Sequence, residues 1–178
     1  MDFKAKLSER IGIEDVREVV CLALQSEERR RELYDLVLGG DDTAGYHAAW
    51  VFTHFPSKDS EWLYDKQDEL IAEVLSCRHG GKRRVLLNLL CKQPFASPPR
   101  VDFLDFCLER MMSIQELPGV RMLCMKIACK LCSPIPELVQ ELKNALEVME
   151  NEESPAIRIV RKNILKAMRK GKSLPGEY

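Results

Sequence analysis

The sequence predicts an all-α fold in which about four two-helix repeats stack into a right-handed α-α superhelix. Three observations predict this fold. No run alternates β-branched or aromatic residues with polar ones, and no Asn-Gly or Asp-Gly turn joins such runs. Apolar residues recur every three or four positions, as on one face of a helix. Prolines stand where helices are expected to begin or end.

Length and composition describe one globular domain over residues 1–178. The chain is 46% hydrophobic and 31% charged, which suits a folded protein with a real core. Its net charge of −1 implies by itself neither a nucleic-acid nor a membrane partner. No apolar run is long enough for a membrane span, and the N-terminus shows no secretory signal. We therefore expect a cytoplasmic protein with no membrane partner.

The first 26 residues are expected to cap the stack. A short segment over 2–10 precedes a helix over 14–25, in which valines and leucines recur at helical spacing. The repeats then cover 27–170. A tail over 171–178 should be flexible, since chain ends with few apolar residues fray.

Proline, serine and glycine set the predicted boundaries of the repeat helices. Three Ser-Pro pairs each offer an N-cap hydroxyl followed by proline at the first helical position, where a missing N–H costs nothing. These pairs are Ser97-Pro98, Ser133-Pro134 and Ser154-Pro155. Pro118 opens a further helix, and the run from Gly39 to Asp42 indicates a helix stop followed by an N-cap. The predicted helices cover 27–38, 42–55, 59–76, 80–93, 98–113, 118–132, 134–149 and 155–170.

The second helices of the repeats align without gaps. Their first column is small: Gly45, Gly81, Gly119 and Ala156, at spacings of 36, 38 and 37 residues. Two positions later the column is imidazole or basic: His47, Arg83, Arg121 and Arg158. Because one helix pair cannot bury its own apolar face, units with this period should stack into a continuous core.

In its period, proline positions and basic column, the chain resembles HEAT/armadillo-like repeat proteins over about 27–170. Two departures lie in the end repeats, where His47 replaces arginine and Arg161 replaces an apolar residue. The resemblance implies that second helices line a concave surface. That surface would carry the candidate partner-binding residues Lys82, Arg83, Arg84, Arg121, Lys126, Arg158, Arg161, Lys162 and Lys166.

The charges of the helices admit two interpretations. Counted with their flanking residues, over 41–55, 79–92, 117–132 and 154–170, the second helices carry a net charge of +11. The first helices, counted over 27–38, 58–76, 98–113 and 134–150, carry −9. Either the basic helices form a cradle for an acidic partner, or they pair internally with acidic first helices of neighbouring repeats. The internal pairing has somewhat more weight. The last helix is the exception, because residues 156–170 carry six basic residues and no acid and should remain a basic surface.

Residues with catalytic or metal-binding chemistry do not form a recognisable site. Cys129 and Cys132 form a Cys-x-x-Cys pair at the C-terminal end of a predicted helix, whereas a redox pair needs the N-terminal end. Most of the seven cysteines lie in apolar helical patterns, which fits buried thiols in a reducing cytosol. His47 and His54 lack the four-residue spacing of a helical metal site. The sequence therefore predicts no enzyme, no cofactor and no metal.

Two functions remain. The first is a non-enzymatic interaction scaffold that binds an acidic protein or peptide on the concave face. The alternative is a DNA-binding or DNA-repair protein that resembles the HEAT-like alkylpurine glycosylases, although their Trp/Asp constellation finds no match here. The sequence leaves the oligomeric state open.

Overall fold

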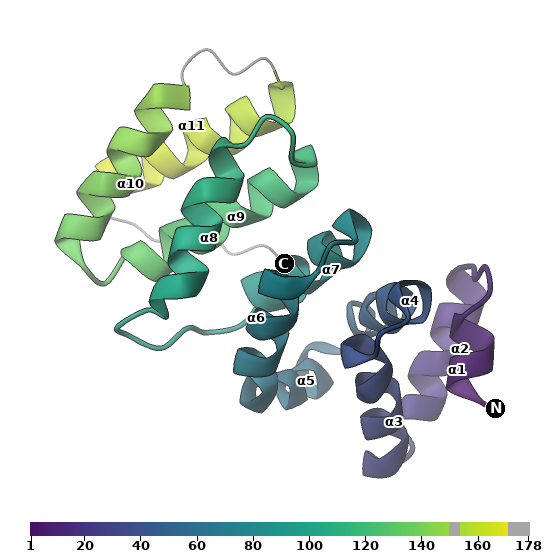
Figure 1. Ribbon diagram of the computed structural model, residues 1–178. Helices are drawn as coiled ribbons and strands as arrows, with labels where there is room; N and C mark the ends of the chain where they lie inside the picture. Colours follow the sequence, from purple (N-terminus) through teal and green to yellow (C-terminus); the bar gives the residue numbers. More distant parts are fainter. Residues whose placement is uncertain (150–153, 171–178) are drawn as a thin grey trace. The chain divides into compact units, whose positions relative to one another are not determined.

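Helices make up all the regular structure that the computed structural model describes, over residues 1–149 and 154–170 (Figure 1). Contacts group the chain into unit 1, residues 1–93, and unit 2, residues 94–178. Unit 1 contains α1 (Phe3–Leu7), α2 (Ile13–Ala23), α3 (Glu27–Leu38), α4 (Asp42–Phe52), α5 (Ser57–Ser60), the 3-10 helix η1 (Glu61–Lys66), α6 (Gln67–Ser76) and α7 (Gly80–Cys91). Unit 2 contains α8 (Val101–Met112), α9 (Pro118–Cys132), α10 (Pro136–Val148) and α11 (Pro155–Arg169). The predicted tail over 171–178 lies outside the described residues.

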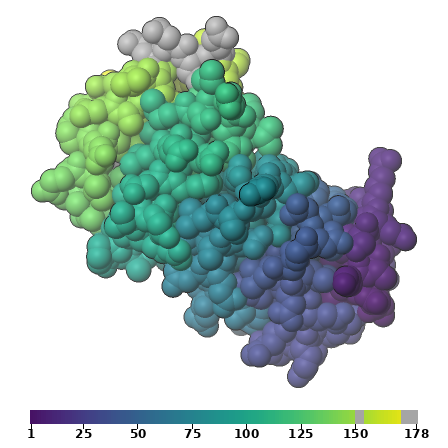
Figure 2. All heavy atoms as spheres, viewed as in Figure 1, coloured from purple at the N-terminus to yellow at the C-terminus, as the bar shows by residue number. Residues whose placement is uncertain are grey.

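Unit 1 is built from helix pairs and a short N-terminal cap. α3 packs on α4, α6 packs on α7, and the second helices α4 and α7 contact each other directly. The helices α1 and α2 both pack on α4, and Phe3 and Leu7 are fully buried. Figure 2 shows the heavy atoms of this unit, purple to teal, as closely packed spheres on the face in view. The predicted pairing of first and second helices is confirmed in this unit.

In unit 2, α9 is the central helix. It packs on α8, α10 and α11, so that it touches every other helix of the unit. Its buried residues lie at three- and four-residue spacing and include Val120, Cys124, Ile127 and Leu131. The apolar side of α11 contributes Ile157 and Ile164 to this core.

Several helix ends match the chemistry that predicted them. The Asp41 carboxylate accepts hydrogen bonds from the backbone N–H groups of Thr43 and Ala44, at 2.9 and 3.0 Å. This cap starts α4 where the sequence predicts it. Pro118 and Pro155 both occupy the first residue of their helices, as expected.

Several predicted helices have different boundaries, among them α4, which ends at Phe52 and not at residue 55. The helix expected over 59–76 divides into α5, η1 and α6, because Trp62 in the middle segment stacks on the Phe52 ring with centroids 6.1 Å apart. Tertiary packing here overrides a helical pattern. α8 begins at Val101, three residues later than predicted. α10 begins at Pro136 because the turn that ends α9 continues to Ile135, whose N–H bonds to the Cys132 carbonyl.

Small residues open the second helices because neighbouring groups approach their backbones closely. A Cβ atom on Gly45 would lie 2.9 Å from the Lys82 Nζ and 3.1 Å from the Leu36 carbonyl oxygen. A Cβ atom on Gly81 would lie 3.0 Å from the His79 ring. The small first column of the repeat alignment therefore has a direct packing cause in unit 1.

Replacing Gly45 with alanine should lower the free energy of unfolding by about 1 to 2 kcal/mol. Overpacking costs about 1–3 kcal/mol, and the better helix propensity of alanine offsets less than about 1 kcal/mol of this. Urea unfolding monitored by circular dichroism measures the change. Gly40→Ala is the matched control, since nothing lies within 4 Å of its added Cβ. A Gly45→Ala protein at least as stable as the control would contradict the packing argument.

A candidate basic interface on the second helices

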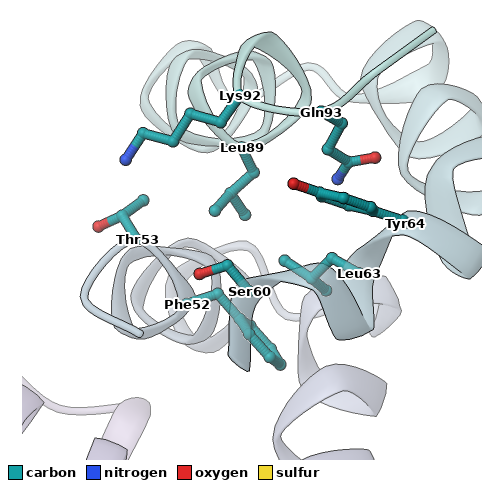
Figure 3. Close-up of a pocket in the computed structure, with 8 residues that line it drawn as sticks. All are labelled: Phe52, Thr53, Ser60, Leu63, Tyr64, Leu89, Lys92 and Gln93. Atoms are coloured by element: carbon teal, nitrogen blue, oxygen red, sulfur yellow. The ribbon is translucent and has the colours of Figure 1, made fainter. Parts of the chain in front are cut away.

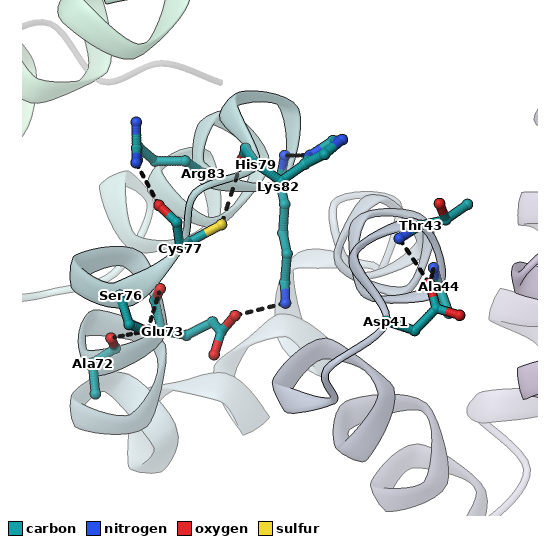
Figure 4. A network of polar contacts seen from close by, with 10 residues as sticks. All are labelled: Asp41, Thr43, Ala44, Ala72, Glu73, Ser76, Cys77, His79, Lys82 and Arg83. Carbon is teal, nitrogen blue, oxygen red and sulfur yellow. Dashed lines mark hydrogen bonds and ion pairs between the residues drawn. The ribbon is translucent and has the colours of Figure 1, made fainter.

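Lys82, the first candidate residue, uses its charge inside unit 1. Its side chain is only 1% exposed, and its Nζ lies 2.6 Å from the Glu73 Oε1. Figure 4 shows the ammonium group reaching from α7 to Glu73 on α6. A lysine this deeply buried needs such a partner, because an unpaired charge is costly away from water. Lys82 therefore links α7 to α6, and its charge is directed to Glu73 and not to a partner.

Glu73 is one of the acidic residues of α6. Its carboxylate is only 19% exposed and pairs with Lys82. One turn earlier, the Glu69 Oε2 accepts a hydrogen bond from the Tyr34 hydroxyl on α3, at 3.3 Å. Burial and then the Glu69 carboxylate raise the pKa of the Tyr34 hydroxyl above its ordinary value. This side of α6 is thus tied to both α3 and α7.

Arg83 and Arg121 each bond to a backbone carbonyl at the end of the preceding first helix. The Arg83 guanidinium donates to the carbonyl of Cys77, which caps the C-terminus of α6 (Figure 4). The Arg121 Nε donates to the Met111 carbonyl near the end of α8, at 3.0 Å, and Arg121 is only 5% exposed. Basic groups at a helix C-terminus satisfy unpaired carbonyls and complement the helix dipole.

The same contact recurs at both ends of the chain, with a change of residue. His47 Nδ1 lies 2.8 Å from the carbonyl oxygen of Leu7, the last residue of α1. In α11 the bond to the preceding helix comes from Arg161, whose Nε lies 2.5 Å from the Leu146 carbonyl oxygen. The ungapped repeat alignment assigns this column to Arg158, which is exposed. The basic column is therefore a structural feature of the repeat, displaced by three residues in its last copy.

The candidate residues thus divide into two groups. Lys82 and Arg121 are buried, and Arg83, Lys126 and Arg161 are half-buried. The exposed candidates are Arg84 in unit 1 and Arg158, Lys162 and Lys166 in unit 2. Lys82 pairs with Glu73 on the first helix of its own repeat, and not with a neighbouring repeat as the internal-pairing interpretation supposes.

The exposed cations of α11 form a stripe, which we call the α11 basic face: Arg158, Lys162, Lys166, Arg169 and Lys170. Four of them follow one another at intervals of four residues, so they lie along one side of the helix. Within residues 1–149 and 154–170, none of the five forms an ion pair with a carboxylate. This surface is the basic region that the sequence predicts for the last helix.

No cluster of three or more His, Cys, Asp or Glu side chains suited to a metal ion occurs in the described part of the chain. None of the seven cysteines forms a disulfide, and five are buried. Burial raises the pKa of the Cys129 thiol, and it raises that of Cys132 to about 11. The Cys-x-x-Cys pair is therefore kept in the thiol form.

Thiol labelling should distinguish Cys21 from the other cysteines. Cys21 is exposed, whereas Cys77, Cys129 and Cys132 have raised pKa values and stay protonated at about pH 8. A disulfide reagent should therefore modify one thiol rapidly in the folded protein and all seven after unfolding. Cys21→Ser should remove the rapid phase. A rapid reaction of two or more thiols in the folded Cys21→Ser protein would contradict the observed burial.

The described helices contain none that is long and apolar enough to cross a lipid bilayer. Comparison with known proteins gives one positive result: the family model described as HEAT repeat domain matches residues 3–168. Neither a curated protein nor a solved structure matches the chain. The match covers both units, including the N-terminal cap, and agrees with the paired helices and the basic column. The chain therefore belongs to the HEAT repeat domain family.

Proposed function

We propose that the chain is a non-enzymatic interaction scaffold that binds an acidic protein or peptide through the α11 basic face. Helical repeat proteins offer extended surfaces that suit this use. The observation that carries the proposal is the row of exposed cations along α11, none of which pairs with a described carboxylate. The free state of all seven thiols supports a reducing compartment such as the cytoplasm.

The five cations of the α11 basic face do not stabilise the helix that carries them, so helix stability does not explain their arrangement. Like charges four residues apart destabilise a helix by about 0.2–0.5 kcal/mol per pair. The helix dipole favours Lys166 and Arg169 near the C-terminus, but it does not favour Arg158 in the second turn. An acidic partner would relieve this repulsion, and binding therefore gives the arrangement a physical reason.

The length of the α11 basic face indicates the length of the partner segment that would cover it. From Arg158 to Lys170 the helix rises by about 18 Å, at about 1.5 Å per residue. An extended peptide covers that length with about five or six residues, at about 3.3 Å each. Ile159 is 61% exposed beside Arg158 and adds an apolar contact at one end. The expected ligand is a short acidic segment with an apolar residue.

The charge of the remaining chain favours a short acidic segment over nucleic acid. The net charge is −1, and α11 with Lys170 contributes six basic residues and no acid, so the other residues carry −7. A long polyanion would meet repulsion from that surface, whereas a short peptide would contact the stripe alone. Nucleic-acid binding is therefore an alternative outcome of the test.

Fluorescence anisotropy with a labelled glutamate-rich peptide and a labelled DNA duplex tests the proposal. Changing Arg158, Lys162 and Lys166 together to glutamate should weaken peptide binding by at least about tenfold, because three attractive charges become repulsive. The control changes three exposed cations of unit 1, Lys4, Arg10 and Lys58, to glutamate and should alter affinity by less than about threefold. Peptide binding that the α11 variant leaves unchanged would reject the interface. Binding of DNA tighter than peptide at moderate salt would assign the face to nucleic acid instead.

A further inference from the structure

Unit 1 contains a small pocket between the ends of α4 and α7 and the segment formed by α5 and η1 (Figure 3). Its apolar wall comes from Phe52, Leu63 and Leu89. Its polar groups are the side chains of Thr53, Ser60, Tyr64, Lys92 and Gln93. No acidic side chain lines it. The pocket therefore combines an apolar surface with hydrogen-bond donors and one positive charge.

Gln93 is the feature that indicates a ligand. The residue is only 3% exposed, and its Oε1 accepts a hydrogen bond from the Gln67 Nε2 at 3.0 Å. Its own Nε2 is buried and has no hydrogen-bond partner. Figure 3 shows this nitrogen directed toward Tyr64, whose hydroxyl points across the pocket. A buried N–H group without an acceptor costs about 1–3 kcal/mol, so an acceptor from a ligand would be stabilising.

The Ser60 and Thr53 hydroxyls use their hydrogens elsewhere and supply no donor to the pocket. The Ser60 and Thr53 hydroxyls already donate to backbone carbonyls of Phe55 and Trp50, at 3.3 and 2.6 Å. Lys92 is exposed, and Figure 3 shows its side chain extending away from Gln93 and Tyr64 toward Thr53, so that its ammonium group adds positive charge on that side of the pocket. The pocket offers a volume of about 30 Å³ to the centres of water-sized groups. Because one water needs about 10–15 Å³ by this measure, the space suits two water-sized groups, such as the oxygens of a carboxylate.

We propose that this pocket binds a glutamate side chain of a protein partner. The carboxylate would accept hydrogen bonds from the Gln93 amide and the Tyr64 hydroxyl. Lys92 would balance the charge and so limit the cost of removing the carboxylate from water. Only the choice of a protein partner rests on the proposed scaffold function. The chemistry of the pocket is independent of α11.

The test uses N-acetylglutamate N-methylamide as the ligand, and the neutral glutamine analogue as its matched control. In the full chain with ¹⁵N-labelled glutamine, the ligand should shift the side-chain amide signal of Gln93 in a saturable way. The glutamine analogue should bind at least about tenfold more weakly, because it lacks the charge that Lys92 attracts. A Gln93 signal that does not move with the ligand would overturn the proposal and assign the space to water alone.

Substitutions of pocket residues test whether the change in the Gln93 amide signal reports binding in the pocket. Lys92→Met and Tyr64→Phe should each weaken binding of the ligand by at least about threefold, the gain expected from one hydrogen bond or one near charge. Lys58→Met, at another exposed lysine of unit 1, should leave it unchanged. Both pocket residues are exposed, so these variants should fold even if Gln93→Met does not. Equal affinity in all three variants would reject the site. The α11 triple variant should bind this ligand normally, which separates a failure of the pocket from a failure of the α11 interface.

Discussion

Glu73→Gln should lower the free energy of unfolding by about 3 kcal/mol. The change removes the negative partner of a lysine whose side chain is 1% exposed and leaves its ammonium group buried without a counter-charge. Loss of one member of a buried pair costs about 3–5 kcal/mol, and the partial exposure of Glu73 places this case at the lower end. Equilibrium unfolding in urea, followed by circular dichroism, gives the value.

The reverse substitution is expected to be much milder. Lys82→Met removes the buried charge and keeps a side chain of similar length, while the Glu73 carboxylate can reach water. This variant should lose less than about 1.5 kcal/mol, the usual cost of a well-tolerated core exchange. The double variant should recover most of the stability lost in Glu73→Gln. Glu73→Gln should lose more stability than Lys82→Met, because it leaves the buried ammonium group without a counter-charge. Equal losses in the two single variants would contradict this prediction.

Arg121→Met should lower the free energy of unfolding by about 2–3 kcal/mol. Arg121 is 5% exposed, and its Nε is hydrogen-bonded to the Met111 carbonyl near the end of α8. Methionine fills much of the space but donates no hydrogen bond, and loss of a charged donor to a buried carbonyl costs about 1.5–3 kcal/mol. For a chain of this length the melting temperature should fall by about 4–12 °C, at about 2–4 °C per kcal/mol.

Arg158→Met is the matched control, because the repeat alignment assigns Arg158 to the same column as Arg121. Arg158 is exposed and forms no ion pair with the described residues, so its loss should change stability by less than about 0.5 kcal/mol. Similar losses in the two variants would show that the column has one role throughout. That outcome would contradict the division between internal and exposed cations.

The helices and their pairing could be predicted from the sequence because local signals set them. The Asp41 cap, Pro118 and Pro155 each act within one turn, and apolar spacing marks the buried faces. The division of the helix over 59–76 could not be predicted, because Trp62 packs on Phe52 from another helix. Family membership, with a match over residues 3–168, agrees with the predicted repeats.

The site was harder to predict than the fold, because burial depends on contacts between helices. Lys82 and Lys162 look alike in sequence, yet one pairs with Glu73 in the interior and the other is exposed. The basic column predicts a cradle only if its side chains point outward, and Arg121 and Arg161 point to carbonyls of preceding helices. Gln93 carries no motif at all. Only its burial beside Gln67 reveals the free amide group.

The central claim is that some basic residues are buried and bonded inside the protein, whereas those of the α11 basic face are exposed and bind a partner. Lysine acetylation footprinting, with and without a glutamate-rich peptide, tests this claim most directly. In the free protein, Lys162 and Lys166 should react rapidly and Lys82 slowly, in line with their exposure. The peptide should protect Lys162 and Lys166 and leave the exposed Lys58 unchanged. Rapid modification of Lys82 in the folded chain, or protection of Lys58 without protection of the two α11 lysines, would contradict the account.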